Sequence, residues 1–422
     1  MLVSKLKRQF SNKFARNIGW LGIAELLTRV FRLGTTVTLA RVFNPHDYGL
    51  VAIIYTVLGF AQVFTMKAGI GAKIIQSKEE ELESVCQTAY WLNWILCVSL
   101  FIVQCILAYP IALFYKETQL TLPICALGLM YLTYPIFLVQ AALIERENRL
   151  KIRALCTSGQ IAISNVTVII LALMGFGVWS VVWSAVLAMP IWILVTHLNH
   201  SWRPSRDFAF KHWRDITNFG SSMLGIELLD KIRLNLDYLI VGRFLSVEAL
   251  GIYFFAFSAG LGISKNVISA VVSALFPYLC EVGEDMKQIK KRYFSSLKIM
   301  GIVIVCLVLL QSSLAPIYVP IVFGSKWNSA IPILIVICLS AIPMAFASAT
   351  YQLLNAIGKI KLNLQWNVIY TVVFTIALLV SVRWGVMAVA FTVLICQLLT
   401  LLFSFWVSKT AFKTASPSST IN

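Results

Sequence analysis

The sequence predicts an all-α integral membrane protein with about twelve transmembrane helices, and three observations carry that prediction. Apolar residues make up 59% of the 422-residue chain and charged residues only 13%, whereas soluble domains are about 45–50% apolar and about 25% charged. The mean hydropathy is +0.83. Several runs of about 18 or more residues are almost free of charge, and such a run is long enough to cross the hydrocarbon core of a membrane as a helix.

Twelve apolar runs separated by polar connectors are the predicted spans, and they must be helical because lipid offers no partner to backbone N–H and C=O groups. The basic stretch MLVSKLKRQFSNKFAR resembles the start of a signal peptide. The next apolar run, however, contains Glu25, Arg29 and Arg32 and no small-residue cleavage site, so we expect a retained first span. The spans are expected at roughly 15–40, 49–73, 88–113, 120–143, 155–175, 177–197, 217–242, 250–274, 297–323, 328–354, 364–382 and 384–408.

The distribution of Lys and Arg predicts that both termini are cytoplasmic. With the N-terminus inside, 25 of these cations fall on inner connectors, and five fall on outer connectors: Arg41, Lys116, Arg243, Lys326 and Arg383. Inner connectors of membrane proteins carry such an excess of Lys and Arg. The split accounts for most of the formal net charge of +17, with membrane lipids as partners of the basic connectors. We therefore expect no nucleic-acid partner.

No motif indicates a metal, a cofactor or a disulfide. The nine cysteines form no C-x-x-C pair and mostly fall inside apolar runs, so we interpret them as small buried hydrophobic residues. None of the four histidines belongs to an H-E-x-x-H cluster. The phosphate-binding pattern G-x-x-x-x-G-K-[ST] does not occur either.

Two segments that lie 202 positions apart resemble each other. ELLTRV, which begins at Glu25, aligns with ELLDKI, which begins at Glu227, and the Arg and Gly of ARVFNPHDYG align with those of GRFLSVEALG. The two copies lie on the first and seventh predicted spans, an offset of six spans, so both have the same orientation in the membrane. This pattern predicts a parallel repeat of two six-helix lobes related by a pseudo-two-fold axis along the membrane normal. The expected lobes are residues 1–200 and 201–410, followed by a disordered cytoplasmic tail at 411–422.

Nine charged residues lie inside the first, seventh and eighth predicted spans. A charge at the bilayer centre costs roughly 2.5–3.5 kcal/mol, so these residues must face protein or a water-filled cavity. At about 100° per residue, the charges of the first span and those of the seventh each fall on one side of their helix. We therefore predict a polar cavity in which five cations bind substrate and four acids line the cavity and couple transport to ions: Arg29, Arg32, Lys231, Arg233 and Lys265, and Glu25, Glu227, Asp230 and Asp237.

The alternative is that these charges form structural ion pairs between the lobes. The pairs Glu25–Arg29, Glu227–Lys231 and Arg233–Asp237 all have the i,i+4 spacing of helical ion pairs. Lys265 has no acid one turn away, which makes it the best single candidate for a substrate-facing cation, although a partner from the first or seventh span stays open. Arg and Lys in a cavity suit a phosphate or diphosphate.

Several segments, in order along nearly the whole chain, are similar to the polysaccharide transporter family, the Wzx-type flippases of the multidrug/oligosaccharidyl-lipid/polysaccharide (MOP) superfamily. One departure is Asn44, which stands where relatives often carry Gly and which also tolerates a left-handed conformation. A second is the expected number of spans, since twelve rather than fourteen argues against a lipid II flippase. The segments are ARVFNPHDYG, GIGAKII, ALIERENRLKIRAL, LDYLIVGRF followed by LGIYFFA, Pro277 before an acidic stretch, and VFGSKWNSAIPIL.

The resemblance implies a MATE-like fold and a flippase that moves an undecaprenyl-diphosphate-linked oligosaccharide across the bacterial inner membrane. The product would enter O-antigen, capsule or exopolysaccharide. Family members alternate the opening of a central cavity and lack an ATP-binding domain, so transport would draw on an ion gradient or the membrane potential without a cofactor. By position on their spans, the family's cavity cations correspond to the five cations named above. Polymerases and glycosyltransferases of the same pathway are further candidate partners.

Two other functions compete with this interpretation. A drug or cation antiporter of the MATE type would favour acids facing its cavity, and five cations against four acids discriminate poorly. A membrane polysaccharide polymerase or glycosyltransferase would need a sizeable catalytic loop or domain, and the connectors are too short for one. We therefore expect a transporter and not an enzyme.

Overall fold

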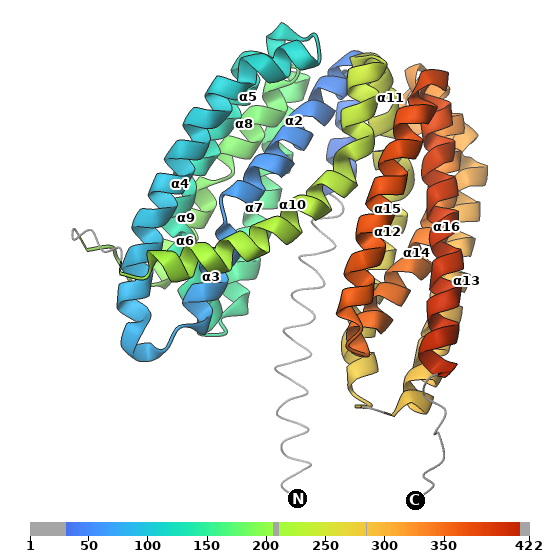
Figure 1. Cartoon of the computed structure of the whole chain (residues 1–422). Coiled ribbons are helices and arrows are strands. Elements are labelled where there is room, and N and C mark those ends of the chain that lie inside the picture. Colours follow the sequence, from blue (N-terminus) through green and yellow to red (C-terminus); the bar gives the residue numbers. More distant parts are fainter. Residues whose placement is uncertain (1–30, 206–210, 284, 414–422) are drawn as a thin grey trace, which may run out of the picture. The chain divides into compact units, whose positions relative to one another are not determined.

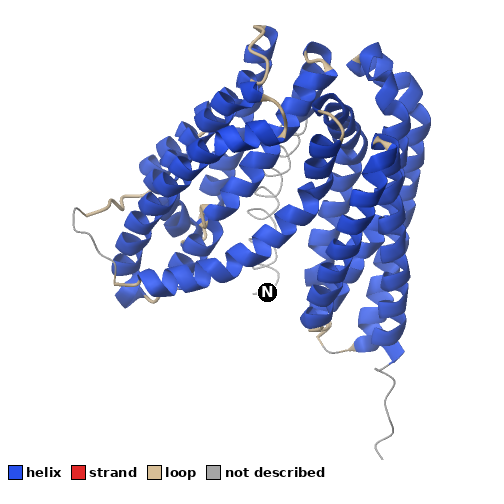
Figure 2. Ribbon diagram, turned by 45° about the horizontal axis from the view of Figure 1, so that its top comes forward, coloured by secondary structure: helices blue, strands red, loops and turns tan. Residues whose placement is uncertain are grey.

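The computed structural model describes residues 31–205, 211–283 and 285–413, and this part of the chain contains helices and no strands (Figures 1 and 2). A helix over 31–42 comes first. The α-helices after it are α2 (Pro45–Phe64), α3 (Lys67–Gln76), α4 (Glu79–Phe114), α5 (Thr121–Leu127), α6 (Tyr134–Arg146), α7 (Leu150–Leu173), α8 (Trp179–Leu187), α9 (Pro190–Asn199), α10 (Trp213–Phe244), α11 (Val247–Ala256), α12 (Gly262–Cys280), α13 (Met286–Tyr318), α14 (Ile331–Ala356), α15 (Ile360–Ser381) and α16 (Val386–Lys413).

Nine helical segments of the described residues are long and apolar enough to cross a membrane, and each coincides with a predicted span. A tenth candidate is a bent pair of helices, Val247–Leu261 with Ser264–Cys280. The predicted span 217–242 is a continuous helix, α10, but its charged residues keep it out of this apolar set. Most of the first predicted span lies outside the described residues. The number twelve therefore stays a prediction.

The chain divides into two compact units. Unit 1 comprises Met1–Phe43 and Ile53–Asn235, and unit 2 comprises Asn44–Ala52 and Leu236–Asn422. Two helices, α2 and α10, therefore contribute residues to both units. The lobes expected at 1–200 and 201–410 are a separate matter and stay a prediction.

Unit 1 is built around the packing of α3, α4 and α6. These helices contact one another and bury an apolar cluster that includes Ile70, Ile74, Val85 and Leu138. Glycine allows α3 to approach α10 closely, because a methyl group on Gly69 would lie 2.7 Å from the Cα atom of Gly220. Small residues favour helix association in membranes because association there depends on close packing.

Unit 2 has α14 at its centre, in contact with α12, α13 and α16 (Figure 1). The fully buried Trp327 stacks on Phe255 with ring centroids 4.1 Å apart, an arrangement that adds to the gain from burying both rings. Large apolar side chains such as Ile317 and Leu402 are exposed on the outside of these helices. Apolar outer faces suit contact with lipid.

The eighth predicted span is bent and not continuous. A π-helical segment, Phe257–Leu261, separates α11 from α12, and the two flanking helices differ in direction by 51°. Gln311 of α13 donates hydrogen bonds to the carbonyl oxygens of Ala259 at 2.9 Å and Gly260 at 2.6 Å. Kinks occur where a side chain inserts into the helical ladder, and π-bulges are enriched at functional sites. A hydropathy pattern carries no signal for this bend.

The helices α2 and α11 begin with the same device at positions 202 residues apart. The side-chain oxygen of Asn44 accepts the backbone N–H of Asp47 at 2.8 Å. The hydroxyl of Ser246 accepts the N–H of Ala249 at 3.0 Å. Both are N-caps, which satisfy donors that a helix leaves free in its first turn. Asn44 therefore serves as a helix cap, a role that the sequence comparison with glycine did not predict.

The first turns of α2 and α11 also contact each other within unit 2. A methyl group on Gly49 would overlap the carbonyl oxygen of Val247, and one on Gly251 would overlap the carbonyl oxygen of Pro45. Pro45 and Val247 are 202 positions apart, as are the two glycines. The contact is therefore reciprocal: equivalent residues of the two similar segments meet each other. Its close approach requires glycine at both positions.

All nine cysteines lie in the described residues and are free. Cys280 and Cys306 are exposed, so the interpretation of buried cysteines is wrong for these two. Cys306 lies within the apolar segment Met286–Phe323, where lipid can cover it, whereas Cys280 is the last residue of α12 and precedes Glu281. No group of three or more His, Cys, Asp or Glu side chains among the described residues could hold a metal ion.

Candidate functional site

Unit 1 contains a cavity of about 640 Å³, which we call the unit 1 pocket. Helices α2, α3, α6, α7, α9 and α10 all contribute to its wall. Its volume falls in the range of about 300–1,000 Å³ that is common for small-molecule sites. The polar and aromatic residues of its wall are Gln62, Thr65, Lys67, Tyr134, Phe137, Glu145, Arg153, Gln160, Trp192, Thr196, Glu227 and Lys231.

A break between α2 and α3 brings Lys67 to the pocket wall. Met66 has a left-handed backbone conformation, φ 50° and ψ 23°, which is uncommon for a residue with a side chain. Thr65 stabilises the break, because its hydroxyl donates to the carbonyl of Gln62 at 2.7 Å and its own carbonyl accepts from Asn93 at 3.3 Å. Such strained backbone concentrates at functional sites.

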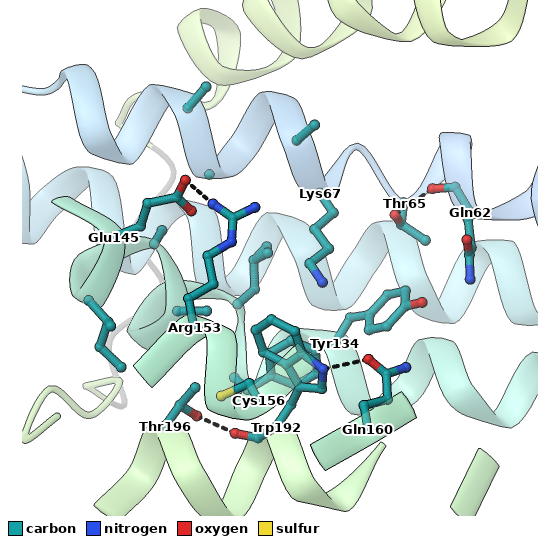
Figure 3. A pocket seen from close by; sticks show the side chains of 18 of the residues that line it. Gln62, Thr65, Lys67, Tyr134, Glu145, Arg153, Cys156, Gln160, Trp192 and Thr196 are labelled. Carbon is teal, nitrogen blue, oxygen red and sulfur yellow. Dashed lines mark hydrogen bonds and ion pairs between the residues drawn. The ribbon is translucent and has the colours of Figure 1, made fainter. Parts of the chain in front are cut away.

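Lys67 is the first residue of α3, where the helix dipole opposes a positive charge. The half-buried side chain points toward three aromatic rings (Figure 3). Its Nζ lies 4.6 Å from the ring centroid of Trp192, 5.2 Å from that of Phe137 and 5.3 Å from that of Tyr134. Each distance is within the range of a cation–π interaction, which is about 6 Å. The rings thus hold a cation at a place where the local backbone disfavours one.

The three rings are themselves held in position. Trp192 Nε1 donates to the side-chain oxygen of Gln160 at 2.6 Å, and the two side chains face each other in Figure 3. Trp192 also stacks on Phe137, with centroids 5.2 Å apart and planes at 28°. Tyr134 meets Phe137 edge to face at 5.8 Å. The aromatic wall therefore does not depend on Lys67 for its arrangement.

Two further groups of charges line the pocket. Arg153 of α7 forms an ion pair with Glu145 of α6 (Figure 3). Glu227 and Lys231 reach the pocket from α10, and Lys231 Nζ would lie 3.9 Å from a methyl group on Gly59. The pocket therefore combines cations, carboxylates, amides and ring faces. This combination can bind an anion through Lys and Arg and polar groups through the amides.

The structure places the nine residues predicted from the sequence as follows. Glu25 and Arg29 lie outside the described residues, and Arg32 is exposed on the helix over 31–42. Glu227 and Lys231, one helical turn apart, both line the unit 1 pocket. These two are the members of the predicted set that the pocket contains.

The remaining four, Asp230, Arg233, Asp237 and Lys265, lie on α10 and α12. Arg233 pairs with Asp230 at 3.1 Å, whereas the i,i+4 spacing predicted Asp237 as its partner. Asp237 is buried and accepts the hydroxyl of Tyr253 at 2.7 Å. Lys265 is exposed on α12, and its charge acts on the Asp237 carboxylate. One electrostatic partner of Lys265 therefore comes from α10.

Three charged residues of the pocket were not among the predicted site residues: Lys67, Glu145 and Arg153. Lys67 and Arg153 both belong to the Lys and Arg residues predicted to lie on inner connectors. Lys67 carries one sequence signal, since it is a single charge between two largely apolar stretches, with no Pro and no polar loop beside it. The rings of Tyr134 and Trp192 come from helices far apart in the sequence, so their gathering around Lys67 could not be predicted.

A family model of polysaccharide biosynthesis proteins matches residues 38–332, which is more than half of the chain. The chain belongs to this family. Related proteins include the lipopolysaccharide biosynthesis protein WzxC of Escherichia coli strain K12, 24% identical over 92% of this chain and 79% of the relative. The teichuronic acid biosynthesis protein TuaB of Bacillus subtilis strain 168 is 24% identical over 92% of this chain and 80% of its own.

The succinoglycan biosynthesis transport protein ExoT of Rhizobium meliloti strain 1021 is 24% identical over 85% of this chain and 72% of its own. Among solved structures, the inward closed conformation of the lipid II flippase MurJ has a TM-score of 0.76 at 14% identity, covering 92% of this chain and 87% of that one. An inward-facing multidrug resistance MATE family transporter of the MOP superfamily has a TM-score of 0.71 at 14% identity, covering 92% and 96%. The chain therefore shares the fold of these two proteins.

Proposed function

We propose that this protein is a flippase that moves undecaprenyl-diphosphate-linked oligosaccharide across the bacterial inner membrane, for O-antigen, capsule or exopolysaccharide synthesis. The observation that carries the proposal is the family match over residues 38–332. The names of the relatives support it, since they refer to lipopolysaccharide, teichuronic acid and succinoglycan. The fold supports transport as the activity.

The proposed mechanism is alternating access between two six-helix lobes, 1–200 and 201–410, with both termini in the cytoplasm. The reciprocal contact of Gly49 and Gly251 with the opposite helix supports a repeat of this kind. The excess of Lys and Arg on the inner connectors supports the orientation. In such a mechanism the substrate stays bound while the two lobes change their packing around it.

The predicted cations are proposed to bind the diphosphate: Arg29, Arg32, Lys231, Arg233 and Lys265. Lys231 is best supported, because it lines a pocket that also contains amides and aromatic rings. The acids Glu25, Glu227, Asp230 and Asp237 are proposed to couple ion movement to transport. Asp237 is the most suitable of the four, since it is buried within hydrogen-bonding distance of Tyr253 and within electrostatic reach of Lys265.

A reconstituted system tests the function. Purified protein in proteoliposomes, loaded with a radiolabelled undecaprenyl-diphosphate-linked oligosaccharide, should move the label to the opposite leaflet, where an added glycosidase can reach it. Lys231→Ala should lower the rate at least about tenfold, because a charge-assisted hydrogen bond contributes about 1.5–3 kcal/mol. Lys151→Ala removes an exposed cation outside the pocket and should leave the rate unchanged.

A genetic experiment gives an independent answer. A strain that lacks this gene and any paralogue should accumulate lipid-linked oligosaccharide on the cytoplasmic leaflet and lose surface polysaccharide, with polymerase and glycosyltransferases of the same pathway as functional partners. Normal surface polysaccharide in that strain would contradict the proposal. Efflux of a cationic dye by the purified protein, without lipid-linked sugar transport, would favour the drug antiporter instead.

A further inference from the structure

We infer that the unit 1 pocket is a two-part recognition site for a diphosphate-linked sugar, in which Lys67 binds the diphosphate and the ring faces that Lys67 now covers bind the attached sugar. The inference rests on the proposed function for the class of substrate. It adds a binding place for the sugar end of that substrate and the residues that recognise the sugar. It also adds an order of events: the diphosphate draws Lys67 away from the rings, and the sugar then binds to the exposed ring faces.

The positive charge of Lys67 is available to an anion. Within the described part of the chain, no carboxylate oxygen lies within 4.0 Å of Lys67 Nζ, and its contacts there are the three aromatic rings. An ammonium group has three N–H donors, and ring faces satisfy them less well than a negatively charged oxygen does. An entering diphosphate therefore offers Lys67 a better partner than its present one.

Lys67 differs from Arg153, another cation that lines the pocket. Arg153 is already neutralised by Glu145, and half of its side chain is exposed. Screening by water weakens the attraction of an exposed, paired cation for an anion. Lys67 is half-buried and faces the pocket, so its charge is the more available one. Lys231 reaches the same pocket from α10 and adds a second positive charge.

The aromatic rings beside Lys67 suit a sugar. A pyranose has a face of C–H bonds that packs on an aromatic face, and its hydroxyls need polar partners beside that face. Trp192 is fixed by Gln160 and by its stack on Phe137, so the ring keeps its place after Lys67 moves. Gln62 also lines the pocket and offers a further amide (Figure 3). One ring face cannot hold the ammonium and a sugar at the same time, which links the two binding events.

The pocket has room for such a ligand next to Lys67. Gly71 lies on the pocket wall one turn along α3, and a methyl group there would meet no atom within 4 Å. A larger side chain at this position would therefore project into open space and fill the pocket without disturbing the wall. This makes Gly71→Leu a test of occupancy that leaves every proposed binding group in place.

The experiment compares two probes on the full-length protein in lipid nanodiscs: undecaprenyl diphosphate, and undecaprenyl diphosphate linked to N-acetylglucosamine. Lys67→Gln should weaken the binding of both at least about tenfold, which is the loss of one charge-assisted contact. Lys73→Gln, on the same helix but outside the pocket wall, is the matched control and should bind both normally. Equal binding by Lys67→Gln and the wild type would overturn the inference.

Trp192→Leu tests the exchange between the ammonium and the sugar. It should weaken the binding of the sugar-linked probe at least about fivefold and leave the binding of undecaprenyl diphosphate equal or tighter, because Lys67 no longer has to leave that ring. A purely structural role for the cation–π contacts would weaken both probes together, and that result contradicts the inference. Gly71→Leu should abolish binding of the sugar-linked probe. Normal binding of that probe by Gly71→Leu would contradict the inference, and this test stands even if Lys67→Gln does not fold.

Failure of this inference and failure of the proposed function give different results. If the wild type moves lipid-linked sugar across proteoliposomes but the variants bind both probes normally, the pocket is not the recognition site and the flippase proposal stands. If the variants change binding as expected but the wild type moves no lipid-linked sugar, the pocket inference stands and the transport proposal fails.

Discussion

Arg146, at the end of α6, joins three helices through one guanidinium group. It donates to the backbone carbonyl oxygens of Ile74 at 3.1 Å and Ile75 at 3.2 Å and to that of Ser77, and it pairs with Glu79 at 3.0 Å. The last carbonyls of a helix have no partner within it, and here Arg146 supplies one for the end of α3. A positive charge at a helix C-terminus is also favoured by the helix dipole.

Replacing Arg146 tests this contact. Arg146→Ala should lower the melting temperature of the detergent-solubilised protein by several degrees, since hydrogen bonds that involve a charged group contribute about 1.5–3 kcal/mol each. The melting temperature of Arg146→Lys should lie between those of Arg146→Ala and the wild type, because lysine keeps the charge but not the planar fork of donors. Lys151→Ala, which removes an exposed cation nearby, is the control. A melting temperature of Arg146→Ala equal to that of the control would refute the structural role.

Arg146 and Lys67 show what sequence can and cannot predict about single residues near a membrane surface. Both were counted among the inner cations that indicate topology. In the structure Arg146 closes the end of a helix and Lys67 faces an aromatic wall. A shift of one residue turns a side chain by about 100° around a helix, and predicted helix ends are uncertain by more than one residue. The sequence therefore predicts the charge at a position, but not the direction in which the side chain points.

At the scale of elements, the segment ARVFNPHDYG and its counterpart GRFLSVEALG gave the most reliable sequence signal. Their glycines, first useful only for aligning the two segments, meet at the crossing of α2 and α11. Their polar residues before each helix, Asn44 and Ser246, both act as N-caps. The capping residues were predictable from their type. The contact between the glycines was not, because sequence similarity does not say that equivalent residues touch.

The crossing of α2 and α11 makes a quantitative prediction. Gly49→Ala and Gly251→Ala should each destabilise the protein by about 1–3 kcal/mol, the usual cost of inserting a methyl group where there is no room. The double variant should cost less than the sum, because one separation of the two helices makes room for both methyl groups. Thermal unfolding followed by tryptophan fluorescence measures these changes.

Gly262→Ala is the control for the crossing. A methyl group there meets no atom within 4 Å, and alanine is favoured over glycine within a helix by up to about 1 kcal/mol. This variant should be as stable as the wild type or slightly more stable. If Gly49→Ala and Gly251→Ala behave in the same way as Gly262→Ala, the two helices do not pack as closely as the structure shows.

At the scale of the whole molecule, composition predicted the class of fold and long apolar runs predicted most of the helices. Nine predicted spans coincide with helices able to cross a membrane, since about 20 apolar residues have one stable conformation in lipid. The division into compact units was harder to predict from the sequence. The units divide α2 after Ala52 and α10 after Asn235, and the lobes expected at 1–200 and 201–410 stay a separate prediction. A single helix can contribute residues to two compact units, and a hydropathy pattern does not show where such a helix is divided.

The orientation of the chain in the membrane is the remaining prediction at this scale. Single cysteines can be introduced at four exposed lysines of a cysteine-free variant: Lys116 and Lys326 on expected outer connectors, and Lys78 and Lys290 on expected inner ones. All nine native cysteines are free, so none is needed for a disulfide, and Cys280 and Cys306 in particular must be removed because they are exposed.

A membrane-impermeant maleimide added to spheroplasts should label the cysteines at 116 and 326 and leave those at 78 and 290 unlabelled until the membrane is broken. The physical reason is the excess of Lys and Arg on one set of connectors, which are retained in the cytoplasm when the helices insert. Each exposed site has its own control in the labelling of broken membranes. Labelling of 78 and 290 in intact spheroplasts would invert the proposed orientation and would place the end of α3, with the Arg146 contact, on the outer side.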